Sequence, residues 1–194
     1  MTKTLLIFAA LLAALALAPA AAPAAYNVLL AGGPEANRIQ ITLSPDGRQY
    51  AIESIVPLEV GGEVCVHPDG VENELVCDAP RIASFEVNSG AGEDIVSVAS
   101  TVPVPVTLRG GPGGDLLIGG GSADKLVGGA GTDHLVGGPG TDALFGGPGI
   151  DVLGGGGGDD LLVGGPSKDH LQGGPGKDLE FPEARTAAKP KPAR

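Results

Sequence analysis

Eight aspartates recur every nine residues in this 194-residue chain, and carboxylates at such a regular spacing could form a functional site. Each is the sixth residue of a nine-residue unit, and eight units follow one another over residues 110–181 without insertion or deletion. Such strict spacing indicates a repeat architecture rather than a loosely glycine-rich segment. If the units stack like strands, about 4.8 Å apart, carboxylates of neighbouring turns repel by ~3.5 kcal/mol at an effective dielectric near 20. A column of aspartates therefore predicts a cation between the turns.

The other positions of the unit supply a turn and a short strand. The first two positions are Gly in all eight units, so the backbone can turn sharply without a Cβ clash. Position eight is Leu in seven units and would point inward from a minimal strand. Two units then make one coil, and Glu180 in the last inward slot predicts a frayed or polar final coil. The predicted inner columns are Leu117, Leu135, Leu153 and Leu171 on one side, and Leu126, Leu144 and Leu162 on the other.

The pattern GGxGxDxUx resembles the RTX, or hemolysin-type, calcium-binding repeat family. The resemblance implies an all-β fold: a right-handed parallel β-roll or β-helix solenoid over residues 110–181, with calcium in the turns. It also implies one Ca²⁺ between each pair of stacked turns, bound by a carboxylate and by main-chain carbonyls from each of the two turns. Four turns on each side of the solenoid leave three gaps per side, which gives about six ions. Calcium suits such gaps because it accepts six to eight oxygen ligands in flexible geometry, unlike Mg²⁺. The implied carboxylate ligands are Asp115, Asp124, Asp133, Asp142, Asp151, Asp160, Asp169 and Asp178. The implied carbonyl ligands are Gly111, Gly113, Gly120, Gly129, Gly131, Gly138, Gly140, Gly147, Gly149, Gly156, Gly158 and Gly165.

Some positions depart from the pattern. Ser122 and Ser167 replace the position-four Gly, and Ile150 is β-branched at position five. Lys168 and Lys177 place positive charge beside the implied ligands. We expect weaker sites where these repeats contribute, and a Gly/Asp-rich linker without fixed structure is the alternative when calcium is absent.

The two ends of the chain differ from the array. Residues 1–25 are typical of a signal peptide, with Lys3, an apolar run and an A-x-A cleavage site at residues 22–24. This predicts a secreted, extracellular protein, free or associated with the cell surface. RTX toxins and proteases leave through a C-terminal signal, so no toxin activity is carried over. Elsewhere no apolar run is long enough to span a membrane, and the Pro/Ala/Lys-rich residues 182–194 predict a disordered tail.

Residues 26–109 predict a small β-rich region. Cys65 and Cys77 are the only cysteines, and an even pair in a secreted chain predicts a disulfide between two strands. A metal role is the weaker alternative, since only His67 lies near them. Residues 32–40 and 89–97 match the nine-residue unit imperfectly, so this region either contains the first coils of the solenoid or matches by chance.

No catalytic set is evident, and the sequence predicts no enzyme. It contains neither G-x-S-x-G nor H-E-x-x-H, and His134 and His170 would lie two coils apart. The net charge of −11 disfavours nucleic acid as a partner. We therefore expect a calcium-binding structural or binding module; an adhesin-like surface protein and a non-catalytic accessory of a carbohydrate-active enzyme are the alternatives. An outer apolar strip could contact an unknown extracellular protein or polysaccharide, or could reflect ordinary β-propensity. It comprises Val127, Ala143, Phe145, Leu161, Val163, Leu179 and Phe181.

Overall fold

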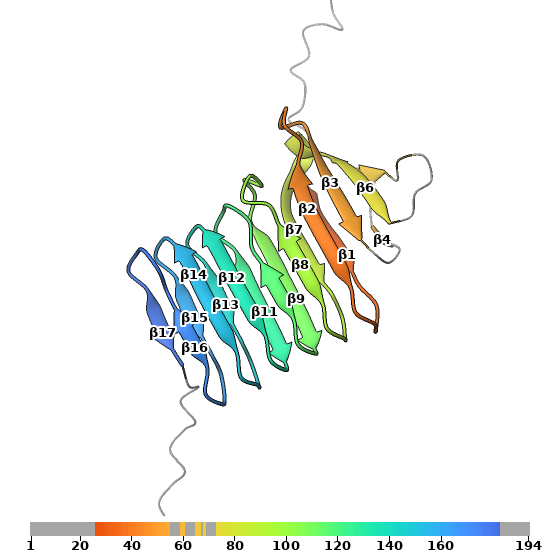
Figure 1. The fold of residues 1–194 in the computed structure, drawn as a ribbon. Coiled ribbons are helices and arrows are strands. Elements are labelled where there is room, and N and C mark those ends of the chain that lie inside the picture. Colours follow the sequence, from red (N-terminus) through yellow and green to blue (C-terminus); the bar gives the residue numbers. More distant parts are fainter. Residues whose placement is uncertain (1–25, 55–58, 61–64, 67, 69–72, 183–194) are drawn as a thin grey trace, which may run out of the picture.

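The chain winds into a flat β-solenoid in which consecutive strands alternate between two facing sheets (Figure 1). The computed structural model describes residues 26–54, 59–60, 65–66, 68 and 73–182. The predicted signal peptide and all of the predicted tail except Pro182 lie outside these residues. From β7 onward every strand pairs in parallel with the strand one coil away, which confirms the predicted parallel solenoid.

Both sheets run the whole length of the molecule. The first contains, in spatial order, β17 (Leu179–Phe181), β15 (Leu161–Val163), β13 (Ala143–Phe145), β11 (Lys125–Ala130), β9 (Val106–Pro112), β7 (Ile82–Asn88), β1 (Tyr26–Ala31) and β4 (Glu59–Val60). The second contains β16 (His170–Gln172), β14 (Val152–Gly157), β12 (His134–Pro139), β10 (Leu116–Ile118), β8 (Ile95–Val98), β2 (Arg38–Leu43), β3 (Gln49–Ser54), β6 (Glu74–Asp78) and β5 (Cys65–Val66). A short 3-10 helix, η2 (Ala79–Arg81), connects β6 to β7.

The leucines of the array lie in the two predicted inner columns. Parallel pairing joins Leu117 to Leu135 and Leu126 to Leu144, and the same register continues along both sheets. Six of the seven leucines are fully buried, and Leu171 in the last complete coil is partly buried. Glu180 pairs with Leu162 and is exposed, as its polar side chain predicts. Each array strand thus buries at most one leucine, worth ~1.5–3 kcal/mol when fully buried.

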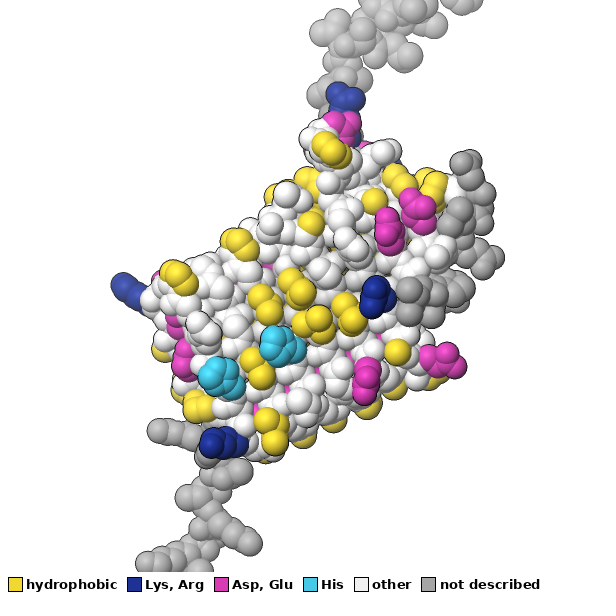
Figure 2. Space-filling view, viewed as in Figure 1, with side chains coloured by type: hydrophobic (Ala, Val, Ile, Leu, Met, Phe, Trp, Pro, Cys, Tyr) yellow, Lys and Arg dark blue, Asp and Glu magenta, His cyan; other side chains and the backbone are white. Residues whose placement is uncertain are grey.

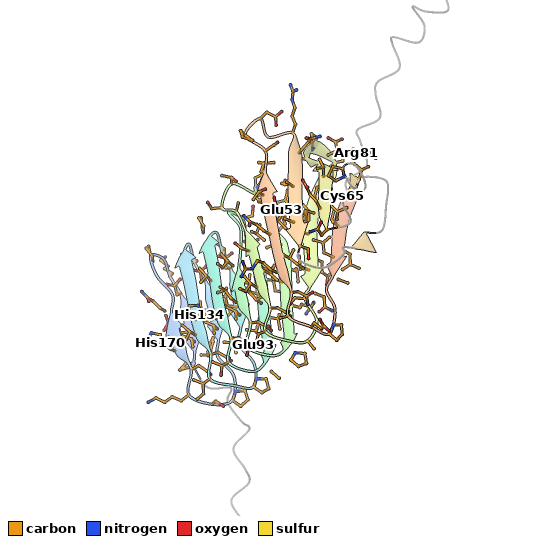
Figure 3. All side chains as sticks on the ribbon, turned by 45° about the vertical axis from the view of Figure 1, so that its right-hand side comes forward. Glu53, Cys65, Arg81, Glu93, His134 and His170 are labelled. Atoms are coloured by element: carbon orange, nitrogen blue, oxygen red, sulfur yellow. A yellow bond between two sulfur atoms is a disulfide. The ribbon has the colours of Figure 1, made fainter. Side chains whose placement is uncertain are left out.

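The N-terminal end has a thicker apolar core. Strands β2, β3, β6 and β5 pair antiparallel beside the first coils, and their inward side chains join those of β1 and β7. Tyr50 and Phe85 meet edge to face with their ring centroids 5.0 Å apart. Cys65 and Cys77 lie opposite each other on β5 and β6 and form the predicted disulfide (Figure 3). This end therefore has apolar and covalent support that the array lacks.

The parallel ladder does not begin at Gly110. β2 pairs in parallel with β8, and β8 pairs in parallel with β10, so the imperfect units at residues 32–40 and 89–97 occupy coils of the same solenoid. Their inward residues, Ile39 and Val96, continue the leucine column. The array is therefore the regular C-terminal part of a longer solenoid.

Candidate metal centre

The aspartates of the array form two ladders, one at the turns on each side of the solenoid. In each ladder, Oδ1 of an aspartate accepts a hydrogen bond from the main-chain N–H of the aspartate one coil earlier, at 2.8–3.0 Å. One ladder runs through Asp115, Asp133, Asp151 and Asp169, and the other through Asp124, Asp142, Asp160 and Asp178. The solenoid thus brings together, in two columns, all eight aspartates that the sequence predicts.

The second oxygen of most of these carboxylates has no partner. Oδ2 is buried without a hydrogen bond in six of the eight: Asp115, Asp133, Asp142, Asp151, Asp160 and Asp169. A buried carboxylate oxygen without a partner costs several kcal/mol unless a cation or proton compensates it. The exceptions lie near the array ends: Asp124 Oδ2 accepts the N–H of Gly120 at 2.7 Å, and Asp178 is only half-buried. The unpartnered oxygens are the main structural evidence that these columns can bind cations.

Most of the repeated glycines have an identifiable steric role. A Cβ on the first glycine of a unit, such as Gly128 or Gly146, would overlap Oδ2 of that unit's own aspartate. A Cβ on the second or fourth residue, such as Gly129 or Gly131, would overlap a carbonyl oxygen of the preceding turn, and both have positive φ. Glycine at these positions therefore leaves space for a carboxylate and for two carbonyl groups.

These carbonyls are the ones that the family resemblance implies. The oxygens of Gly111 and Gly113 project across the gap toward Gly129 and Gly131 of the next turn on the same side. The same relation holds for the carbonyls of Gly120, Gly129, Gly131, Gly138, Gly140, Gly147, Gly156 and Gly158. Facing Gly149 is Ser167, and Gly165 has no later turn on its side within the described residues.

The donor set fits a hard cation such as Ca²⁺. In the part of the chain that the structure describes, no three His, Cys, Asp or Glu side chains converge on one point. A site must therefore combine carboxylates from two turns with main-chain carbonyls, which gives an all-oxygen set of the kind that calcium prefers. The residues present thus fit calcium, whose charge would compensate the unpartnered oxygens.

Burial also perturbs the titration of these carboxyls. It raises the pKa of Asp133 and Asp142 to about 6, with the neighbouring aspartates of the same ladder adding to the shift. Burial likewise raises the pKa of Asp115, Asp124 and Asp151. Hydrogen bonds from main-chain N–H groups oppose the shift in every case. The ladders are therefore poor sites for bare negative charge.

The two serine substitutions have different outcomes. Ser167 keeps the turn geometry of the array and has φ 126°, the only positive φ at a non-glycine residue in the described chain. Ser122 does not have a positive φ, and the glycines of its unit, Gly120 and Gly121, do not either. The second unit therefore has a different turn, in which Gly120 donates to Asp124. The turn of the regular units is therefore altered at Ser122, whereas Ser167 retains it in a strained conformation.

The outer faces carry the remaining candidate groups. His134 and His170 lie in one outward column with Val152 between them, so they are two coils apart, as predicted (Figures 2 and 3). The predicted apolar strip lies along β11, β13, β15 and β17 in the expected register. Its most exposed members are Leu179 and Phe181, with exposed fractions of 60% and 45%.

Two residues outside the array continue one ladder, although the sequence did not mark them as ligands. Asp94 donates its main-chain N–H to Asp115 Oδ1 at 2.9 Å, and Asn37 donates likewise to Asp94 Oδ1 at 2.7 Å. Asp94 is buried, and its Oδ2 lacks a hydrogen bond. The signal for both residues was the imperfect nine-residue unit in which each takes the aspartate position.

Comparison with known proteins identifies the repeat. The family model described as the RTX calcium-binding nonapeptide repeat (4 copies) matches residues 107–135, 118–153 and 154–179. No curated protein and no solved structure matches the chain. No helix among the described residues is long and apolar enough to cross a membrane.

Proposed function

From the RTX calcium-binding repeats at residues 107–179, we propose that this protein is a secreted calcium-binding module whose folding depends on calcium. The ions would lie between consecutive turns on each side of the solenoid. There they would be held by the aspartate ladders and the glycine carbonyls. The module has a structural or binding role and no catalytic one.

The unpartnered carboxylate oxygens carry the proposal. Each array strand buries at most one leucine, whereas fixing each residue's backbone costs ~1–2 kcal/mol of entropy. Without cations, the turns also stack buried carboxylates on one another. Calcium would remove this penalty and bridge successive turns, so its binding free energy would become folding free energy.

Secretion is supported by two features of different kinds. Residues 1–25 have the composition of a signal peptide, and the Cys65–Cys77 disulfide suits an oxidising compartment. Extracellular calcium modules bind their ions at ~10⁻⁴–10⁻³ M, the affinity range that we expect here. An extracellular protein or polysaccharide could contact the apolar strip of the outer face.

A calcium titration tests the function directly. Circular dichroism of the mature chain should show a cooperative gain of β-structure as calcium is added and a loss when a chelator is added. Magnesium at the same concentration should produce little change, because it demands near-octahedral geometry. The proposal fails if the spectrum and the thermal unfolding midpoint are both indifferent to calcium.

A further inference from the structure

We propose that the chain has a calcium site outside the nonapeptide array, between the turn of residues 89–94 and the turn of residues 110–115. The inference rests on the proposed function, because it assigns the same chemistry to a gap that the matched repeats do not include. The site would extend one calcium column by one position. It would bring the expected number of ions from the six gaps within the array to seven.

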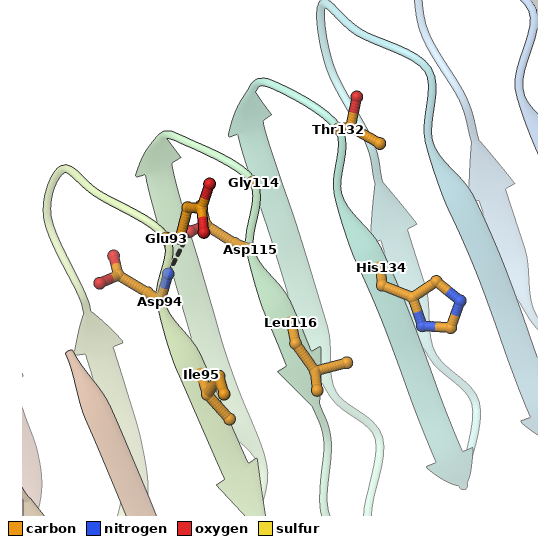
Figure 4. A pocket seen from close by; sticks show the side chains of 8 residues that line it. All are labelled: Glu93, Asp94, Ile95, Gly114, Asp115, Leu116, Thr132 and His134. Carbon is orange, nitrogen blue, oxygen red and sulfur yellow. Dashed lines mark hydrogen bonds between the residues drawn. The ribbon is translucent and has the colours of Figure 1, made fainter. Parts of the chain in front are cut away.

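The carboxylates of this gap are arranged as in the array. Asp115 Oδ1 accepts the N–H of Asp94 at 2.9 Å, the length found between Asp115 and Asp133 (Figure 4). Asp94 and Asp115 have exposed fractions of 1% and 2%, and both retain an Oδ2 atom without a hydrogen bond. The gap therefore presents the same uncompensated pair of carboxylates as the gaps between regular repeats.

The main chain supplies the same carbonyls as well. Gly90 and Gly92 have positive φ, like the second and fourth residues of most regular units. A Cβ on Gly111 would overlap the Gly90 oxygen, and a Cβ on Gly113 would overlap the Gly92 oxygen. Two carbonyl groups thus project across this gap, although the coil that joins the two turns has 21 residues instead of 18.

The column ends one turn earlier, at Asn37. This buried side chain donates from Nδ2 to the carbonyl oxygens of Glu35 and Ser89 at 2.5 and 2.8 Å, and to Asp94 Oδ1 at 3.1 Å. The amide thus donates to the kinds of oxygen that face a cation elsewhere in the column. No cation is needed in this gap, because the neutral Asn37 amide donates to these oxygens and adds no negative charge of its own.

The opposite column ends differently. Asp124 is its first aspartate, and both carboxylate oxygens accept main-chain hydrogen bonds, Oδ1 from Val106 at 2.9 Å and Oδ2 from Gly120 at 2.7 Å. Among the described residues, no acidic residue precedes Asp124 in that ladder, so the gap before it offers a cation no unpaired carboxylate oxygen. Only the column containing Asp94 extends beyond the array.

Counting the bound ions tests the proposal. Native mass spectrometry of the calcium-loaded mature chain should give seven ions for wild type and six for Asp94→Asn. Glu93→Gln is the matched control: it removes the same charge one residue away, but Glu93 is exposed, so seven ions should remain. A variant Asp94→Asn that binds as many ions as wild type would overturn the proposal.

A crystal structure of the wild-type chain grown with calcium gives a second test that needs no substitution. We expect an ion between residues 89–94 and 110–115, and none between residues 32–37 and 89–94. Ions confined to the array would refute this inference and leave the proposed function intact. A chain that binds no calcium at all would refute both.

Discussion

The main-chain N–H of Asp124 donates to Oδ1 of Asp142 over 2.8 Å, while Oδ2 of Asp142 is buried without a hydrogen bond. One oxygen thus fixes the distance between successive turns, and the other is left for a ligand. The relation recurs along both ladders, so six of the eight array aspartates combine one oxygen that links two turns with one oxygen that is left for a ligand.

Substituting an aspartate in the middle of a ladder should weaken calcium-dependent folding more than substituting one at its end. Asp142→Asn should shift the calcium midpoint upward several-fold, because Asp142 lies between two turns of its column. Asp178→Asn should shift it less, since this half-buried residue belongs to the last coil. Circular dichroism during calcium titration measures both, with exposed Asp159→Asn as the control. Equal shifts for Asp142→Asn and Asp159→Asn would disprove a ligand role for Asp142.

The inward and outward positions of a strand should respond very differently to charge. Leu144→Asp removes a fully buried side chain and introduces an unpaired carboxylate, which should cost more than the ~2–5 kcal/mol of a buried Leu→Ala change. Ala143→Asp, at the adjacent outward position, should cost less than about 1 kcal/mol. Urea unfolding in saturating calcium measures both. Equal destabilisation would show that the register of the strands is wrong.

Acidification should stabilise the calcium-free fold. The pKa values of Asp133 and Asp142 are raised to about 6 from 3.8, chiefly by burial. A carboxyl group with a higher pKa in the folded state contributes stability that is complete below the unfolded-state value of 3.8 and is lost as pH rises through about 6.

We therefore expect more β-structure in chelator-treated protein at about pH 4.5 than at about pH 7.5. With calcium present the direction reverses, because protons compete with the ion for the same oxygens. Circular dichroism at the two pH values checks both expectations. A chelated protein that gains no structure on acidification would contradict the first.

Relieving backbone strain at Ser167 should stabilise the calcium-bound protein. Its φ of 126° lies in a region that side chains rarely adopt, at a cost of ~1–3 kcal/mol. Ser167→Gly should remove that strain at an entropic cost of about 0.5–1 kcal/mol and raise the thermal midpoint by a few degrees. Ser122→Gly is the matched control, because Ser122 does not have a positive φ. If both variants shift the midpoint equally, strain at Ser167 is not the cause.

The sequence alone determined the periodic part of this protein. A nine-residue period with Gly, Asp and Leu at fixed positions allows few backbone solutions, because each position has one steric role. Gly128 leaves room for the carboxylate of Asp133 in the same unit, and Gly129 leaves room for the Gly111 carbonyl of the preceding turn. Leu126 fills the core. The parallel solenoid, its register and the two aspartate columns followed from that pattern. The disulfide followed from the cysteine count.

Only the tertiary structure decided where the columns end. The patterns around Asn37 and Asp94 were too degenerate to separate from chance in a glycine-rich chain, and the 21-residue coil breaks the period. Long-range hydrogen bonds place both residues in one ladder. Main-chain N–H groups of Val106, from another strand, and of Gly120, from the same turn, satisfy both carboxylate oxygens of Asp124. Whether a carboxylate oxygen has a partner depends both on the conformation of its own turn, as for Gly120 and Asp124, and on residues from other coils. The spacing of the repeats therefore predicted the column, and only the packing of the coils showed which oxygens remain free.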